Sequence, residues 1–124
     1  MMRLKARGRP KQRERGSMNG IEREYSELLQ ARKLAGEIAD WAFEAENLRL
    51  ADLTYYRPDF RVMLPDGSIQ FHETKAMTSK GAVLFEDDAR VKIKVAAEQH
   101  WMYQFVGAYR RPKKSGGGWK FETF

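Results

Sequence analysis

The sequence predicts a mixed α/β domain, and three observations lead to this class. A helical apolar stripe follows Asn19, two strand-like runs flank a Pro-Asp-Gly turn at 65–67, and a second helical stripe follows residue 87. The expected order is therefore helix, strands, helix and strand in a mixed layer. A chain of 124 residues is long enough for one modest core, which predicts a single folded domain.

The first helix is expected to begin after Asn19, which is a favoured N-cap residue. Glu22 and Glu24 lie near the positive helix start, and Gly36 is suited to end the helix. The apolar positions recur with the helical period at Ile21, Tyr25, Leu28 and Leu29.

The strands are predicted from β-branched and aromatic runs. Residues 41–51 alternate irregularly and indicate one strand. A hairpin is expected next, with strands at 59–64 and 68–76 around the turn. Pro58 fits a strand start, where its missing N–H costs least.

The second helix is expected to be capped by Asp87 or Asp88. Residues 101–109 indicate a further core strand, and residues 119–124 a short edge strand after a basic turn. The helix is expected to face the core with Val91, Val95 and Ala96.

Composition restricts the possible functions. The formal charge of +6 and the sequence pI of about 9.7 favour a polyanionic partner such as nucleic acid, although a basic tail also serves solubility. The absence of cysteine excludes disulfides and thiolate metal sites. No apolar run is long enough to span a bilayer, and no secretory signal follows the basic N-terminus, so a cytoplasmic location is expected.

Charged residues continue the apolar face of the second hairpin strand. Phe71, Glu73 and Lys75 share one face because side chains on a strand alternate. Two charges on a core-facing register are costly unless they pair, bind a metal or meet a cleft. Asp59 starts the partner strand at the same end of the hairpin, so two carboxylates and one ammonium are expected to converge.

This group is suited to phosphodiester hydrolysis. The hard oxygen ligands of Asp59 and Glu73 suit Mg²⁺, which polarises a phosphoryl oxygen and lowers the pKa of a bound water. Lys75 would orient that water and offset developing charge. Glu22 or Glu24 would supply a third carboxylate, and periodicity alone does not choose between them. The competing interpretation is an ordinary surface ion pair.

Pro58-Asp59 followed by Glu73-Thr74-Lys75 resembles the PD-(D/E)xK nuclease superfamily, which includes restriction enzymes and Holliday junction resolvases. "YRPDFRVMLPDGSIQFHETKA" and "DDARVKIKVAAEQ" resemble a small phage-encoded group in that superfamily, formerly a domain of unknown function. The resemblance spans roughly residues 19–108. Ala76 departs from the pattern, which has glycine after the motif lysine, and the link to the next helix is longer than expected.

The resemblance implies a restriction-endonuclease-like core of helix, three-stranded meander, helix and strand. It implies Asp59 and Glu73 as metal ligands and Lys75 on the catalytic base side. It favours Glu22 as the helix glutamate, since the pattern has an aromatic three residues later, here Tyr25. On the second helix, Lys94 is favoured over Lys92 to face the site or a DNA phosphate.

Other aromatic and basic side chains are assigned simpler roles. His72 and His100 are expected to have no chemical role. The large aromatics are expected to lie in the core or an interface: Trp41, Tyr55, Tyr56, Trp101, Tyr103 and Phe105. Base stacking is the alternative for Tyr55 or Tyr56.

Residues 1–17 hold seven Lys or Arg and one Glu, which predicts a flexible basic DNA-binding arm before a nuclease domain at 18–124. Arg7-Gly8-Arg9-Pro10 resembles an AT-hook core that enters a narrow A·T minor groove. An unspecific cationic arm is the alternative. The flanking side chains expected on phosphates are Lys5, Lys11, Arg13 and Arg15.

The expected function is a Mg²⁺-dependent (or Mn²⁺-dependent) DNA endonuclease, with branched DNA as the favoured substrate. Symmetric cutting of a junction needs two sites, which predicts a homodimer. Two alternatives remain: a catalytically silent DNA-binding module of the same fold, and a protein-interaction factor that blocks a host defence enzyme.

Overall fold

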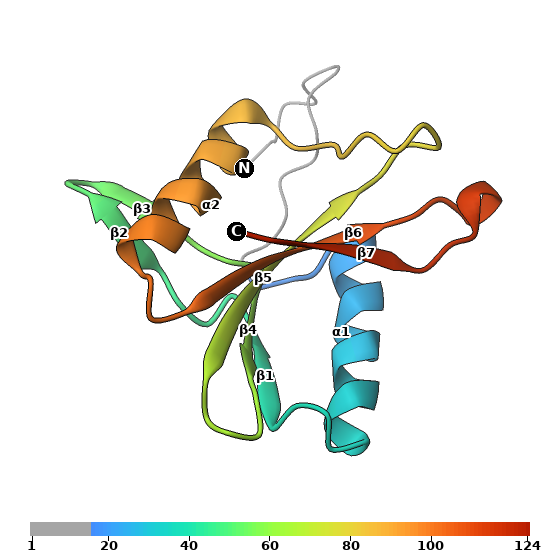
Figure 1. The fold of residues 1–124 in the computed structure, drawn as a ribbon, viewed down its shortest axis with the longest axis horizontal. Helices are drawn as coiled ribbons and strands as arrows, with labels where there is room; N and C mark the ends of the chain where they lie inside the picture. The colour runs from blue at the N-terminus through green and yellow to red at the C-terminus, as the bar shows by residue number, and fades with distance from the viewer. Residues whose placement is uncertain (1–15) are drawn as a thin grey trace, which may run out of the picture.

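The computed structural model describes residues 16–124 (Figure 1). The first helix, α1, spans Gly20–Leu34 and begins with the predicted cap at Asn19. Asn19 Oδ1 accepts the Glu22 N–H at 2.8 Å, and Glu22 Oε1 accepts the Asn19 N–H at 2.9 Å. This reciprocal capping box satisfies two free helix donors. Gly36 follows the helix with φ at +79°, which confirms its predicted role at the C-terminal end.

A mixed five-stranded sheet forms the centre of the domain. The strand order is β1 (Asp40–Phe43), β4 (Phe60–Met63), β5 (Ile69–Ala76), β6 (Gln104–Arg110) and β7 (Trp119–Thr123). Strands β1, β4 and β5 form an antiparallel meander. Helix α2 (Asp87–Gln99) then crosses over so that β6 runs parallel to β5. Strand β7 pairs antiparallel with β6 at the edge, after a short 3-10 helix at Lys113–Ser115. The mixed α/β class and the edge strand are therefore confirmed.

The hairpin that carries the charged motif forms as predicted. Gly67 has φ at +89°, and Asp66 Oδ1 accepts the Ser68 N–H at 2.9 Å. Both features are typical of a tight turn between strands. The register places Phe60 opposite His72, so Asp59 and Glu73 meet at the far end of the hairpin.

The predicted single strand at 41–51 is wrong. β1 ends at Phe43, and β2 (Leu48–Ala51) pairs with β3 (Thr54–Tyr56) in a separate two-stranded sheet. The break occurs at Glu44, whose φ of +48° turns the chain out of the strand. Figure 1 shows this hairpin projecting from the sheet beside α2.

The second helix differs from its prediction in two details. Its N-cap is Glu86, so Asp87 and Asp88 lie in the first turn. Val91 is 59% exposed, whereas Ile93 is fully buried, because Ile93 and Ala96 share the inner face at helical spacing. Strand β6 begins three residues later than expected.

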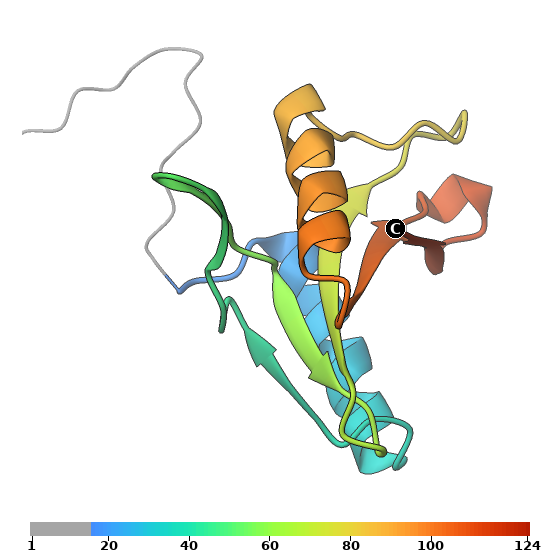
Figure 2. The ribbon, with the colours of Figure 1, turned by 60° about the vertical axis from the view of Figure 1, so that its left-hand side comes forward.

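The two helices cover opposite faces of the sheet (Figure 2). On the α1 face, Tyr25 and Leu29 pack against Phe60, Val62 and Ala108. On the α2 face, the core includes side chains of the β2–β3 hairpin as well as of the sheet and the helix. Its buried members are Leu48, Leu50, Tyr56, Phe71, Ile93, Ala96 and Phe105. Across residues 16–124, no helix is both long and apolar enough to cross a membrane.

Candidate metal and catalytic site

Asp59 and Glu73 lie side by side at the end of the β4–β5 hairpin that is farthest from its turn. Asp59 precedes β4, and its Oδ2 accepts both the Thr74 backbone N–H at 2.8 Å and the Thr74 hydroxyl at 2.9 Å. Both of these bonds end on the same carboxylate oxygen. The local sequence fixes this arrangement because Thr74 stands next to Glu73 on the paired strand.

Lys75 accompanies Glu73 on the same strand face. Its Nζ lies 3.7 Å from Glu73 Oε2 and 5.5 Å from the centre of the Phe85 ring. The aromatic face attracts the ammonium and restricts its position. The structure therefore brings together the three hairpin residues that the sequence predicted: two acids and one lysine. Phe85 was not predicted, since it comes from the segment between β5 and α2.

Tyr56 is a site residue that the sequence analysis did not assign. Its hydroxyl donates to Glu73 Oε1 at 2.6 Å, and the residue is only 7% exposed. A buried tyrosine needs a hydrogen-bond partner, and here the partner is the candidate metal ligand. Tyr56 therefore lies in the core, as expected, and is not placed to stack on a base, whereas Tyr55 is 43% exposed. The only sequence signal was its position three residues before Asp59.

The structure distinguishes the two glutamates of α1. Glu22 is buried, and its charge raises the pKa of both Asp59 and Glu73. Glu24 is exposed and forms an ion pair with Arg110 at 2.6 Å. Helix α1 thus directs Glu22, and not Glu24, toward the carboxylate pair.

Burial dominates the electrostatics of the pair. It raises the pKa of Asp59 well above its usual range, and the Glu73 carboxylate raises it further, against the effect of the Thr74 hydrogen bonds. Burial also raises the pKa of Glu73, while the Tyr56 hydroxyl and the Lys75 ammonium lower it. Two desolvated acids that repel each other favour either a proton or a cation between them.

The donor set fits Mg²⁺ chemically. Within residues 16–124, no group of three or more His, Cys, Asp or Glu side chains is arranged to hold a metal ion. Mg²⁺, however, is commonly bound through one or two carboxylates, with waters and substrate phosphates completing its shell. The Asp59–Glu73 pair matches that limited protein contribution.

Comparison of the chain with models of known protein families, with curated proteins and with solved structures finds no match. The function must therefore be inferred from the site itself.

The two histidines have structural roles, as expected. His72 is on the opposite face from Glu73, where its Nδ1 bonds the Tyr25 hydroxyl at 2.6 Å and its Nε2 bonds Gln70 Oε1 at 2.8 Å. Because the Gln70 oxygen can only accept, Nε2 carries the proton and Nδ1 accepts from Tyr25. Burial lowers the pKa of His72 to about 3, so it stays neutral. His100 Nε2 lies 3.0 Å from the Arg49 carbonyl and ties α2 to β2.

The other predicted residues lie apart from the pair or outside the described chain. Lys94 is exposed and Lys92 half-buried, and the DNA contact expected of Lys94 stays a prediction. Trp101 is 78% exposed, which excludes a core position, whereas Phe105 is buried. The arm residues Lys5, Arg7, Arg9, Lys11, Arg13 and Arg15 precede residue 16 and lie outside the described residues.

Proposed function

We propose that this protein is a Mg²⁺-dependent DNA endonuclease of the PD-(D/E)xK fold. The observation that carries the proposal is the pairing of half-buried Asp59 with buried Glu73, with Lys75 held 3.7 Å from Glu73. A meander followed by a helical crossover to a parallel strand supports the implied core. Fold alone does not establish function, so the nuclease activity is inferred from these three side chains.

Each residue has a defined task in the proposed reaction. Asp59 and Glu73 would hold the cation, with Glu22 adding negative charge beside them. Bound there, Mg²⁺ supplies Lewis-acid polarisation of the phosphoryl oxygen and a more acidic water. Lys75 directs its ammonium at the attacking water and offsets the charge that develops on the phosphate. Tyr56 holds Glu73 in one orientation through its hydroxyl.

Branched DNA is the proposed substrate, by analogy with small resolvases of the resembling superfamily. Symmetric cutting of a four-way junction requires two sites, so the active form is proposed to be a homodimer. Strand β7 offers an exposed sheet edge for that contact.

The test is a cleavage assay on a four-way junction, a flap and a linear duplex, in Mg²⁺, in Mn²⁺ and in EDTA. Wild-type protein should cut only with metal, and Lys75→Ala and Asp59→Asn should abolish cutting. Lys80→Ala, in an exposed turn, is the matched control and should retain activity. Cleavage that survives both site substitutions would reject the site. Binding without cleavage in both metals would instead identify a silent DNA-binding module.

A further inference from the structure

Strand β7 leaves one edge of the central sheet without a partner (Figure 1). It has five residues, Trp119–Thr123, and its only neighbouring strand within residues 16–124 is β6. Phe121 on this edge is 48% exposed, and Lys120 and Thr123 are exposed as well. An open strand of this kind presents unpaired N–H and C=O groups to a second strand.

The register of β7 on β6 identifies which of its backbone groups point outward. The Phe124 N–H donates to the Phe105 carbonyl at 2.9 Å. Beyond the other end of the strand, the Arg111 N–H donates to the Gly118 carbonyl, also at 2.9 Å. Hydrogen-bonded pairs alternate along an antiparallel ladder, so the even-numbered residues of β7 bond to β6. The outward groups belong to the odd-numbered residues: Trp119, Phe121 and Thr123.

This outward edge is complementary to a second copy of itself. In an antiparallel pair centred on Phe121, each Phe121 lies opposite Phe121 of the other copy, and Trp119 lies opposite Thr123. These are the residues whose N–H and C=O groups point outward, so each opposed pair exchanges two hydrogen bonds. The pairing therefore satisfies the groups that β7 leaves free, and its two-fold symmetry closes the assembly at two chains.

The same register places opposite charges across from each other. Lys120 lies opposite Glu122 of the other copy, in a non-hydrogen-bonded position where side chains approach most closely. Across residues 16–124 the Lys120 ammonium makes no ion pair or hydrogen bond. Glu122 is fixed on the same face of the strand by Arg90 at 2.9 Å and by the Tyr109 hydroxyl. A lone lysine on an edge strand usually keeps other strands away, but this register gives it an acid to pair with.

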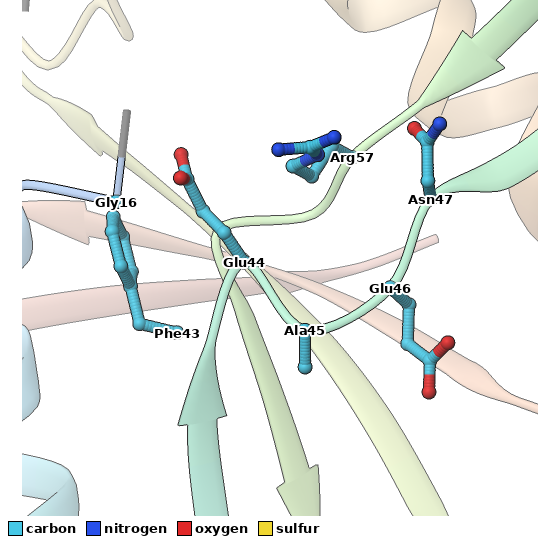
Figure 3. Close-up of a pocket in the computed structure, with 7 residues that line it drawn as sticks. All are labelled: Gly16, Phe43, Glu44, Ala45, Glu46, Asn47 and Arg57. Atoms are coloured by element: carbon cyan, nitrogen blue, oxygen red, sulfur yellow. The ribbon is translucent and has the colours of Figure 1, made fainter. Parts of the chain in front are cut away.

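The opposite edge of the sheet is less suited to such a contact. Strand β1 has only four residues. The chain then turns out of it at Glu44 and continues through Ala45 and Glu46 toward β2, along the wall of the pocket in Figure 3. The β7 edge is therefore the longer and straighter one.

We propose that two copies of this chain pair through β7 into one continuous sheet, with Phe121 on the two-fold axis. Because that axis is perpendicular to the sheet, Glu73 of both copies faces the same side. Five strand spacings separate β5 of one copy from β5 of the other, so the two candidate sites lie roughly 25 Å apart. Sites on one face at that separation can act on two strands of one DNA. This use of the dimer rests on the proposed nuclease function, but the pairing itself can be measured without DNA.

The first test measures the mass of the full-length protein by sedimentation equilibrium. Wild type should have twice the 14.5 kDa mass of one chain. Lys120→Glu sets like charges opposite each other and should raise the dimer Kd at least about tenfold. Lys114→Glu makes the same charge change in the exposed 3-10 helix and should leave the Kd unchanged. A wild type that stays monomeric up to about 100 µM, or equal Kd values for the two variants, would overturn the proposal.

The second test reports the register directly. The chain has no cysteine, so single-cysteine variants can be oxidised without background. Phe121→Cys should form a disulfide-linked dimer, because the Cα atoms of a hydrogen-bonded pair lie about 5.5 Å apart, within disulfide range. Thr123→Cys lies on the same face of the same strand, but its two copies would be roughly 13 Å apart and should not link. Equal linking of the two variants, or no linking of Phe121→Cys, would contradict the pairing.

The pairing and the nuclease function can fail separately. On a plasmid that extrudes a cruciform, wild type should release linear DNA by paired cuts, whereas Lys120→Glu should release mainly nicked circles. If the protein dimerises and links through Phe121→Cys but never cuts DNA, the pairing stands and the nuclease function falls. If it cuts DNA as a monomer, the nuclease function stands and the pairing falls.

Discussion

At the scale of single residues, the candidate site should lower the stability of the fold. Asp59 and Glu73 are desolvated and repel each other, so the folded state raises the pKa of both. Functional sites often carry such perturbed groups, because a fold selected for stability alone would neutralise them. The metal-free protein should therefore be more stable with these acids protonated than ionised.

Asp59→Asn tests this cost directly. Because the folded state raises the pKa of Asp59, the contribution of this carboxyl to stability is fully present below its unfolded pKa and is lost as pH rises through the folded pKa. Asparagine cannot ionise, and its side-chain oxygen can still accept the two Thr74 hydrogen bonds. In thermal melts with EDTA, the variant should exceed wild type by about 1–3 kcal/mol at pH 8, with a smaller gain at pH 5.

Added Mg²⁺ provides the control for that experiment. It should raise the Tm of wild type and leave Asp59→Asn unchanged. A variant that is less stable than wild type at pH 8, or that still responds to Mg²⁺, would show that Asp59 is an ordinary structural carboxylate.

Tyr56→Phe tests the positioning of Glu73. The Tyr56 hydroxyl lowers the pKa of Glu73, so its removal should shift the acidic limb of the pH–rate profile to higher pH. Cleavage should fall about tenfold, whereas stability should fall by only about 1 kcal/mol. Tyr55→Phe, on the exposed side of β3, should change neither. A uniform drop in rate at every pH, without a shifted limb, would point to a purely structural bond.

At the scale of secondary structure, local signals were sufficient for some elements and not for others. The Asn19 cap, the Pro-Asp-Gly turn and the helical stripe of α1 act over a few residues, and all three appear as the sequence predicts. The break after Phe43 could not be predicted from local signals. It depends on the left-handed backbone of Glu44, which is maintained by a hydrogen bond to the distant Asp59 carbonyl. Likewise, no periodicity in the sequence predicts the hydrogen bond from Tyr56 to Glu73, because that contact depends on how β3 packs beside the sheet.

Helix α1 gives a test that separates capping from charge. Glu22→Gln keeps the capping box with Asn19, since glutamine serves at that position, but removes the charge beside Asp59 and Glu73. Stability should change by less than about 1 kcal/mol, while Mg²⁺-dependent cleavage should fall at least about tenfold. Both quantities can be followed by melts and by the junction assay.

Glu24→Gln is the matched control on the same helix. It removes only an exposed pair with Arg110, which is worth at most about 1 kcal/mol, and should leave cleavage unchanged. If Glu22→Gln cuts as well as Glu24→Gln, the helix glutamate serves the fold alone.

At the scale of the whole molecule, charge is divided unevenly along the chain. Residues 1–17 contain seven of the 23 Lys and Arg side chains and one of the 17 acids, so residues 18–124 carry no formal net charge. The domain that holds the candidate site therefore offers little non-specific attraction to DNA. Long-range affinity for the phosphate backbone should depend on the basic N-terminal segment, while chemistry depends on the Asp59 pair.

Deletion of residues 1–15 separates these contributions. The truncated protein should bind a duplex more weakly and with a flatter dependence on salt, because each lost phosphate contact removes about 0.9 from the slope. Cleavage of a junction at saturating protein should persist, since Asp59, Glu73 and Lys75 are retained. Gly8→Ala keeps every charge in the segment and distinguishes its two interpretations. An AT-hook predicts that this variant loses preference for A·T duplex, whereas an unspecific cationic segment predicts no change. Loss of cutting by the truncated protein at saturation would place part of the catalytic apparatus in residues 1–15.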